Sequence, residues 1–165
     1  MISPGLLKRY PKLLADGAQE TSPIDPVYNC IAWSARRDKS IWWQPGGGTG
    51  QYWPPGVLDD FSFESFVQLF ETLGYKRCVG SQLEICYEKV ALYDDGLGFT
   101  HVSSQLPSGA WTSKLGQDED IQHNSLEALE GNVADEYGKV RQILKKRCGF
   151  FGVLLRVFFK IKLSF

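Results

Sequence analysis

The sequence predicts an α+β domain in which N-terminal helices, one of them carrying Cys30, pack on a C-terminal antiparallel sheet. Apolar residues recur at helical spacing between Ser62 and Gly74, whereas from Glu88 onward they alternate with polar residues at the period of a strand. The chain has 165 residues, of which 43% are hydrophobic. This length and composition suit one globular domain with its own core.

Composition along the chain divides it into three regions. We expect an irregular lead-in over residues 1–26, a single α+β domain over residues 27–147 and a basic, aromatic tail over residues 148–165. Prolines interrupt any long helix in the lead-in. These prolines are Pro4, Pro11, Pro23 and Pro26.

Charge is unevenly distributed although the net charge is only -1. Residues 1–140 carry 11 basic and 19 acidic side chains, whereas residues 141–165 carry seven basic side chains and no acidic one. An acidic body argues against nucleic acid as a partner, because phosphate binding requires clustered Lys and Arg. No stretch reaches the roughly 20 apolar residues of a membrane span, and residues 1–14 lack the features of a signal peptide. We therefore expect a cytoplasmic protein.

The helical elements come first. Asn29 is a favourable N-cap for a short helix with Cys30 in its first turn, and Ser62 caps the helix that ends at Gly74. Between them, residues 38–57 form an aromatic, Gly-rich loop. Its tryptophans, Trp42, Trp43 and Trp53, either cover the core or form the wall of a substrate cleft.

The strands follow. Residues 88–93, 100–106 and 110–115 are predicted to form an antiparallel meander, with turns at 94–98 and 107–109. A helical turn over 125–129 and a further strand over 139–144 complete the sheet. The tail is expected to form an extra strand, a membrane-surface segment or an irregular extension, in that order of preference.

Cys30 is the best candidate for a nucleophile. A thiol in the first turn of a helix faces free backbone N–H groups, which predicts a lowered pKa. His101, at the start of a strand, is the candidate base that takes the thiol proton. The alternative is that both are ordinary core residues.

The register of the central hairpin suggests further site residues. If the turn is centred between Ser108 and Gly109, residue 101 lies opposite residue 116, and His101 shares one face with Ser103, Thr112 and Lys114. Asp118 or Asp120 at the strand exit then orients the imidazole, with Asp120 preferred. Lys114 is a candidate for binding an acidic substrate group, and Asn29 for stabilising an oxyanion.

The four cysteines, Cys30, Cys78, Cys86 and Cys148, show neither a CxxC pair nor metal-ligand spacing. We expect reduced thiols, no bound metal and no cofactor.

Several segments resemble a family of uncharacterised bacterial domains. The resemblance runs from about Val27 to about Arg147 and implies no function. The segments are YNCIAW (28–33), YWPPGV (52–57), FETLGY (70–75), EKVALY (88–93), THVSSQLPSGAWTSKLG (100–116), EDIQH (119–123), LEALEG (126–131) and YGKV (137–140).

The order of a Cys-bearing helix and a later His-bearing strand is similar, more distantly, to the papain-like cysteine peptidase superfamily in its NlpC/P60 and transglutaminase-like branches. That resemblance implies a papain-like fold, Cys30 as nucleophile and His101 as base. The third member would come from the next strand or its exit, here Ser113, Lys114 or Asp120. This sequence departs from the superfamily pattern there, because no Asn, Asp or Gln occupies the strand WTSKL (111–115).

We therefore expect a cysteine-dependent amide hydrolase, a peptidase or amidase that acts on a protein or peptide through a Cys30 thioester. A deamidase or acyltransferase would use the same pair of residues. The rival hypothesis from another class is a non-catalytic interaction module, such as an immunity or accessory domain. Weak contact of the tail with a membrane surface is a further expectation.

Overall fold

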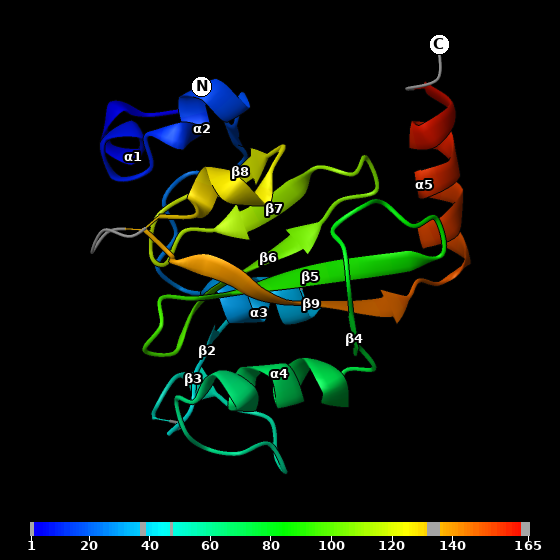
Figure 1. Ribbon diagram of the computed structural model, residues 1–165. Coiled ribbons are helices and arrows are strands. Elements are labelled where there is room, and N and C mark those ends of the chain that lie inside the picture. The colour runs from blue at the N-terminus through cyan, green and yellow to red at the C-terminus, as the bar shows by residue number, and fades with distance from the viewer. Residues whose placement is uncertain (1, 37–38, 47, 132–135, 163–165) are drawn as a thin grey trace.

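A seven-stranded antiparallel sheet lies between two layers of helices in the computed structural model, which describes residues 2–36, 39–46, 48–131 and 136–162 (Figure 1). The strand order is β1-β8-β7-β6-β5-β9-β4. The strands are β1 (Gln19–Glu20), β4 (Lys76–Cys78), β5 (Tyr87–Asp94), β6 (Phe99–Gln105), β7 (Trp111–Lys114), β8 (Asp120–His123) and β9 (Lys139–Arg147). The α+β class is confirmed.

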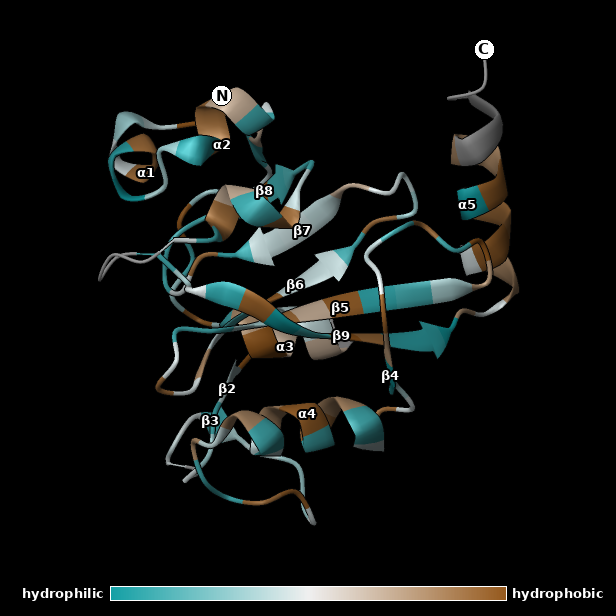
Figure 2. Cartoon of the chain, viewed as in Figure 1, coloured by the Kyte–Doolittle hydropathy of each residue, from teal (hydrophilic) through white to brown (hydrophobic). Residues whose placement is uncertain are grey.

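Alternate residues of the sheet enter two separate cores because both faces are covered. On one face, Val90 and Leu92 of β5 pack with α3 (Cys30–Arg36) and α4 (Phe63–Thr72). On the other face, Ala91 and Tyr93 pack with α1 (Pro4–Arg9), α2 (Lys12–Asp16) and the 3-10 helix η1 (Leu126–Leu129). The apolar stripe of α4 faces the sheet, as its brown and teal bands show in Figure 2.

The predicted helix caps are confirmed. The Asn29 side-chain oxygen accepts a hydrogen bond from the N–H of Ala32 at 3.1 Å, and the Ser62 hydroxyl accepts one from the N–H of Ser65. Gly74 follows α4 with a φ of 89°, a backbone conformation that favours glycine. The strands at 88–93, 100–106, 110–115 and 139–144 and the helical turn at 125–129 are also confirmed.

The prediction of an irregular lead-in is wrong for residues 4–20, which form α1, α2 and β1. Two of the prolines lie at the beginning of a helix. Pro4 occupies the first turn of α1 behind the cap Ser3, and Pro11 is the N-cap of α2. Proline is tolerated there because the first N–H groups of a helix have no partner within it.

The tail is also not a strand, because Phe150–Lys162 form α5, which stands at the side of the sheet (Figure 1). In the loop region, β2 (Trp42–Trp43) pairs in parallel with β3 (Gln51–Tyr52) as a small second sheet. Strands β4 and β8 were not predicted. Each is short and gains its regular structure by pairing with a neighbour, β9 and β7 respectively.

The central hairpin differs from the prediction by one residue. Ser104 lies opposite Thr112 and Gln105 opposite Trp111, because the connection is a three-residue loop, 107–109, with Gly109 at a φ of 95°. A shift of one residue moves side chains to the opposite face of a strand. The predicted shared face of His101, Lys114 and Thr112 is therefore wrong.

The N-terminal helix α2 is expected to contribute to stability through the burial of Leu13. Leu13 of α2 is 0% exposed, whereas its neighbour Leu14 is 72% exposed. Leu13→Ala should lower the free energy of unfolding by about 2 to 5 kcal/mol, and Leu14→Ala by no more than about 0.5 kcal/mol. Urea denaturation of both variants tests this, and equal midpoints would contradict the packing of α2.

Candidate active site

A cavity of about 210 Å³ brings two of the predicted catalytic residues to one place, at the start of α3 and β6. Cys30 and His101 both line it, together with Asn29 and Trp42 of the predicted substrate-binding residues. The remaining lining residues are Ile31, Gln44, Phe61, Phe66, Phe99, Thr100, Gly116 and Tyr137.

Cys30 begins α3 and is buried in the core layer between that helix and the sheet. Burial raises the pKa of its thiol to about 11, against the smaller opposing effect of the backbone N–H groups of Val102, Cys30 and Ile31. The prediction of a lowered pKa is therefore wrong. Loss of water around the sulfur outweighs the N–H groups at the start of this seven-residue helix.

His101 is buried on the opposite face of the sheet from α3. Its ring stacks on Tyr137, with the ring centres 4.1 Å apart and the planes at 12°, and lies 5.4 Å from the ring of Tyr93. Neither ring nitrogen has a hydrogen-bond partner among the described residues. Burial, and to a smaller extent the charge of His123, lower the pKa of His101 well below its ordinary value.

A chain of polar side chains runs along the same face as His101. The Ser103 and Ser113 hydroxyls lie 2.7 Å apart, and the Ser113 hydroxyl lies 2.9 Å from Nε2 of His123. His123 Nδ1 is 2.7 Å from the carbonyl oxygen of Ser125. Ser113, named by the papain-like resemblance, is therefore bonded to His123 and Ser103.

Asp120, the predicted third catalytic residue, does not contact the imidazole of His101. Its buried carboxylate accepts hydrogen bonds from the Tyr28 hydroxyl at 2.8 and 2.7 Å and pairs with Nζ of Lys39 at 3.0 Å. It lies on the α3 side of the sheet, because the one-residue change of register separates its face from that of His101. Asp118, the other candidate, pairs with Arg9.

Lys114, predicted to bind substrate, lies on the same side as Asp120. Its Nζ lies 4.9 Å from the centre of the Tyr28 ring and donates a hydrogen bond to the carbonyl oxygen of Asp118. Burial lowers the pKa of Lys114. Lys114 therefore lies in the wall behind Tyr28 and does not line the Cys30 cavity.

The three tryptophans of the loop lie in different places. Trp42 lines the Cys30 cavity, whereas Trp43 is buried, with its ring 4.6 Å from that of Tyr52. Trp53 lines a different hollow of about 480 Å³ formed by residues 46–59, and its Nε1 donates to the carbonyl oxygen of Leu58. They do not form one continuous wall.

Tyr137 is the main site residue that sequence reasoning missed. It lies after the last helical turn, far along the chain from Cys30, and supplies the aromatic surface on which His101 stacks. It belongs to the block YGKV, which gave the only signal at this position. Its side chain also stacks on Tyr10 of the N-terminal segment, with ring centres 5.4 Å apart.

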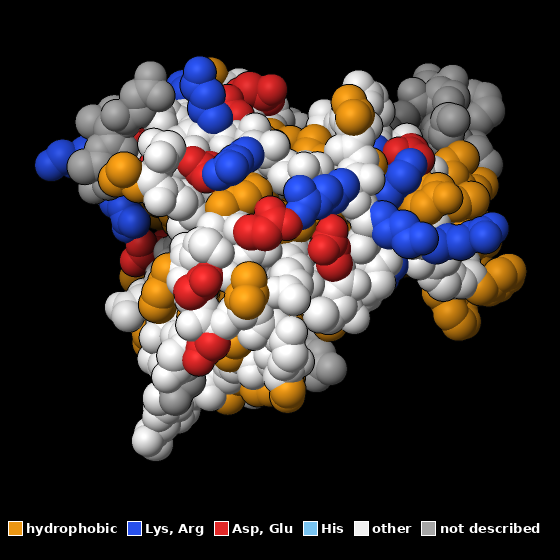
Figure 3. Space-filling model, turned by 60° about the horizontal axis from the view of Figure 1, so that its bottom comes forward, with side chains coloured by type: hydrophobic (Ala, Val, Ile, Leu, Met, Phe, Trp, Pro, Cys, Tyr) orange, Lys and Arg blue, Asp and Glu red, His pale blue; other side chains and the backbone are white. Residues whose placement is uncertain are grey.

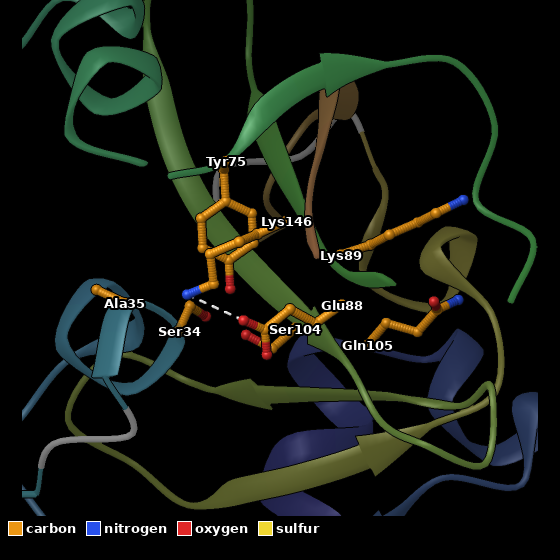
Figure 4. Close-up of a pocket in the computed structure, with 8 residues that line it drawn as sticks. All are labelled: Ser34, Ala35, Tyr75, Glu88, Lys89, Ser104, Gln105 and Lys146. Atoms are coloured by element: carbon orange, nitrogen blue, oxygen red, sulfur yellow. Dashed lines mark ion pairs between the residues drawn. The ribbon is translucent and has the colours of Figure 1, made fainter. Parts of the chain in front are cut away.

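A second cavity, of about 200 Å³, lies near the other end of α3 (Figure 4). Figure 4 shows the polar ends of Ser34, Ser104 and the ion pair Glu88–Lys146 gathered on one side, while Lys89 extends away. This cavity shares no lining residue with the first and is lined by neither a thiol nor an imidazole. It is therefore not a candidate for the same chemistry.

Burial of two neutral histidines makes stability depend on pH. The pKa of both His101 and His123 is lowered in the folded chain. Below pH about 6.5 the unfolded chain therefore binds more protons than the folded chain, and this proton binding favours unfolding. Folding stability should thus fall as pH falls from 6.5 to 5, by up to about 1.4 kcal/mol per pH unit for each histidine. His101→Phe keeps an aromatic ring for the stack on Tyr137 and should remove about half of this slope. Thermal unfolding of the unaltered chain and of His101→Phe at several pH values measures this slope. An equal slope in the two proteins would contradict the burial of a neutral His101.

Comparison with known proteins identifies the family. Residues 19–145 match the family described as a domain of unknown function (DUF7689). No curated protein and no solved structure matches the chain. The match includes every lining residue of the Cys30 cavity and leaves out α1, α2 and α5. The resemblance to a domain family without a known function is confirmed, and the chain belongs to the DUF7689 family.

Proposed function

We propose that this protein is a cysteine-dependent amide hydrolase, a peptidase or amidase, with Cys30 as nucleophile and His101 as base. One observation carries the proposal. Cys30 and His101 line the same cavity, and both ring nitrogens of the buried His101 lack a hydrogen-bond partner among the described residues.

An unpartnered buried imidazole is unusual in a folded protein. Most buried polar atoms are paired, and leaving one unpaired costs about 1 to 3 kcal/mol. Here the nearby rings of Tyr137 and Tyr93 offer aromatic contacts but satisfy neither nitrogen. We propose that one of these buried, unbonded nitrogens accepts a proton from a reacting group in the cavity that His101 lines.

In the proposed reaction the Cys30 sulfur attacks the carbonyl carbon of the amide while its proton passes to a ring nitrogen of His101. The resulting imidazolium then gives that proton to the nitrogen of the leaving amine, and the carbon–nitrogen bond breaks. A thioester remains on Cys30. Water then loses a proton to His101 as its oxygen attacks the thioester carbon. The carbon–sulfur bond breaks, the carboxylic acid is released, and His101 returns the proton to the sulfur of Cys30.

Burial makes the resting pair neutral. The thiol pKa of Cys30 is raised and the imidazole pKa of His101 is lowered, so neither carries a charge near pH 7. Proton transfer then accompanies attack on the substrate, and a stable thiolate–imidazolium pair does not precede it. This differs from a cysteine that is activated by its helix alone.

The developing oxyanion needs hydrogen-bond donors. We assign this role to the backbone N–H groups of Cys30 and Ile31, whose effect on the sulfur is to lower the pKa of the thiol. The Asn29 amide nitrogen is already bonded to the carbonyl oxygen of Trp43 at 2.5 Å, so Asn29 acts by fixing the loop beside the cavity. Tyr137 is a positioning residue that fixes the plane of the His101 ring.

The cavity wall indicates the kind of substrate. Trp42, Phe61, Phe66 and Phe99 surround the pair with aromatic surface. Such a wall favours a peptide or protein group with an apolar side chain next to the reacting amide. The order of a Cys-bearing helix and a His-bearing strand is similar to papain-like enzymes, in which deamidation or acyl transfer would use the same thioester.

A non-catalytic interaction module is the second candidate. The observation that favours it is the high thiol pKa of Cys30, since a protonated, buried thiol is typical of a core cysteine. In that case Cys30 and His101 only fill the space between the sheet and its helices.

Alkylation by iodoacetamide, followed by mass spectrometry, distinguishes the two functions. With a neutral imidazole as base, both partners keep their reactive form between pH 6.5 and 8, so the Cys30 rate should be nearly independent of pH there. In His101→Phe the rate near pH 7 should fall roughly a hundredfold and then rise about tenfold per pH unit, because only thiolate reacts.

The exposed Cys86 is the internal control. Its alkylation rate, measured in the same spectra, shows whether the reagent concentration or the extent of unfolding differs between the two proteins. Its rate should be equal in both proteins. If Cys30 has the same rate and the same pH dependence with and without His101, the hydrolase proposal fails and the interaction module stands.

An activated ester can be used to form the proposed thioester on Cys30 and to observe it directly. p-Nitrophenyl acetate should transfer its acetyl group to Cys30 and release nitrophenolate, and the acetyl group should then be lost to water. Acetylation should be absent at this position in Cys30→Ala and roughly a hundredfold slower in His101→Phe. If the acetyl group remained on Cys30 in the protein of unaltered sequence, that result would contradict the hydrolysis step.

A further inference from the structure

An ordinary surface helix turns its apolar side toward the core. Helix α5 has the opposite arrangement, with an apolar side that faces solvent. Five of its large apolar side chains face solvent. They are Phe150 and Phe151, each 78% exposed, Leu154 (55%), Leu155 (49%) and Phe158 (61%). Their spacing places all five on one face of the helix.

Contacts with the body set this orientation. Arg156, on the opposite side of α5, is 3% exposed, and its guanidinium donates a hydrogen bond to the carbonyl oxygen of Leu106 at 3.1 Å. Before the helix, the N–H of Cys148 donates to the carbonyl oxygen of Cys86. The charged side chain therefore faces the protein, and Phe150, Phe151 and Phe158 face outward.

Positive charge lies beside this apolar face. Residues 141–165 contain seven Lys and Arg and no Asp or Glu. Of these cations, Arg141, Lys145 and Lys146 pair with acidic side chains of β5 and the loop before it, and Arg156 is buried. Arg147, three residues before α5, is exposed and has no ion pair with any described residue. In Figure 3 orange side chains gather at the right, where α5 lies, beside a group of blue Lys and Arg side chains.

We propose that α5 binds the surface of an anionic lipid bilayer, with its phenylalanine and leucine face inserted at the boundary between headgroups and acyl chains. A helix that combines a wide apolar face with surrounding cations is the pattern of an interfacial membrane helix. Anionic headgroups complement the acid-free C-terminal segment.

The helix lies on the bilayer and does not cross it. Its 13 residues span about 20 Å, and the hydrocarbon core is about 30 Å thick. In the described part of the chain, no helix combines the length and apolar character needed to cross a membrane.

Charge also argues against a second copy of the chain as the occupant of this face. A symmetric dimer would bring two identical α5 helices together. The exposed Arg147 beside each face would find no acidic counterpart in residues 141–165 of the other copy, because that segment contains no Asp or Glu. An anionic lipid surface supplies the opposite charge.

Flotation of the full chain with lipid vesicles tests the proposal. The protein should float with vesicles of equimolar phosphatidylcholine and phosphatidylglycerol and bind at least about tenfold more weakly to phosphatidylcholine alone. The double variant Phe151→Ser, Phe158→Ser should lose about tenfold or more in binding to the anionic vesicles. Arg147→Gln should weaken it about fivefold.

The matched control is Val79→Ser with Leu97→Ser, since these apolar side chains are 99% and 96% exposed but lie outside α5. It should bind like the unmodified protein, and all variants should keep the same thermal midpoint. The proposal fails if anionic vesicles do not bind the protein or if both double variants bind equally. It also fails if the phenylalanines instead support a dimer that the Phe151→Ser, Phe158→Ser variant abolishes.

Discussion

The alternation of side chains along β5 and β6, in a sheet covered on both faces, is the constraint on which the rest of the structure depends. Val102 faces α3, while His101, its neighbour in β6, faces Tyr137 on the other side. The thiol of Cys30 and the imidazole of His101 thus belong to different core layers. They border a common cavity because β6 and α3 both begin there.

The same constraint explains the chemistry proposed for the pair. Layers on both sides of the sheet remove water from Cys30 and His101, which raises the pKa of the thiol and lowers that of the imidazole. Both groups are therefore held in their neutral forms. A neutral pair suits a mechanism in which the proton moves together with the attack on the substrate.

The N-terminal helices and α5 lie outside the region matched to the family, yet they pack differently against the rest of the domain. Helices α1 and α2 bury Leu6, Tyr10 and Leu13 in the core and support Tyr137 through its stack on Tyr10. Helix α5 leaves its apolar residues exposed. Helices α1 and α2 thus complete the core beside the Cys30 cavity, whereas α5 is the helix for which we propose membrane-surface binding.

The sequence by itself determined the elements whose signals are local. Caps at Asn29 and Ser62, helical spacing in α4 and alternation in β5 and β6 act within a few residues, and the candidates Cys30 and His101 came from such patterns. Only the tertiary structure decided the register at 107–109, the separation of Asp120 from His101 and the direction of both pKa shifts. The outward face of α5 was decided in the same way, through Arg156. These properties depend on contacts and burial between segments far apart in the chain, which spacing along the sequence does not encode.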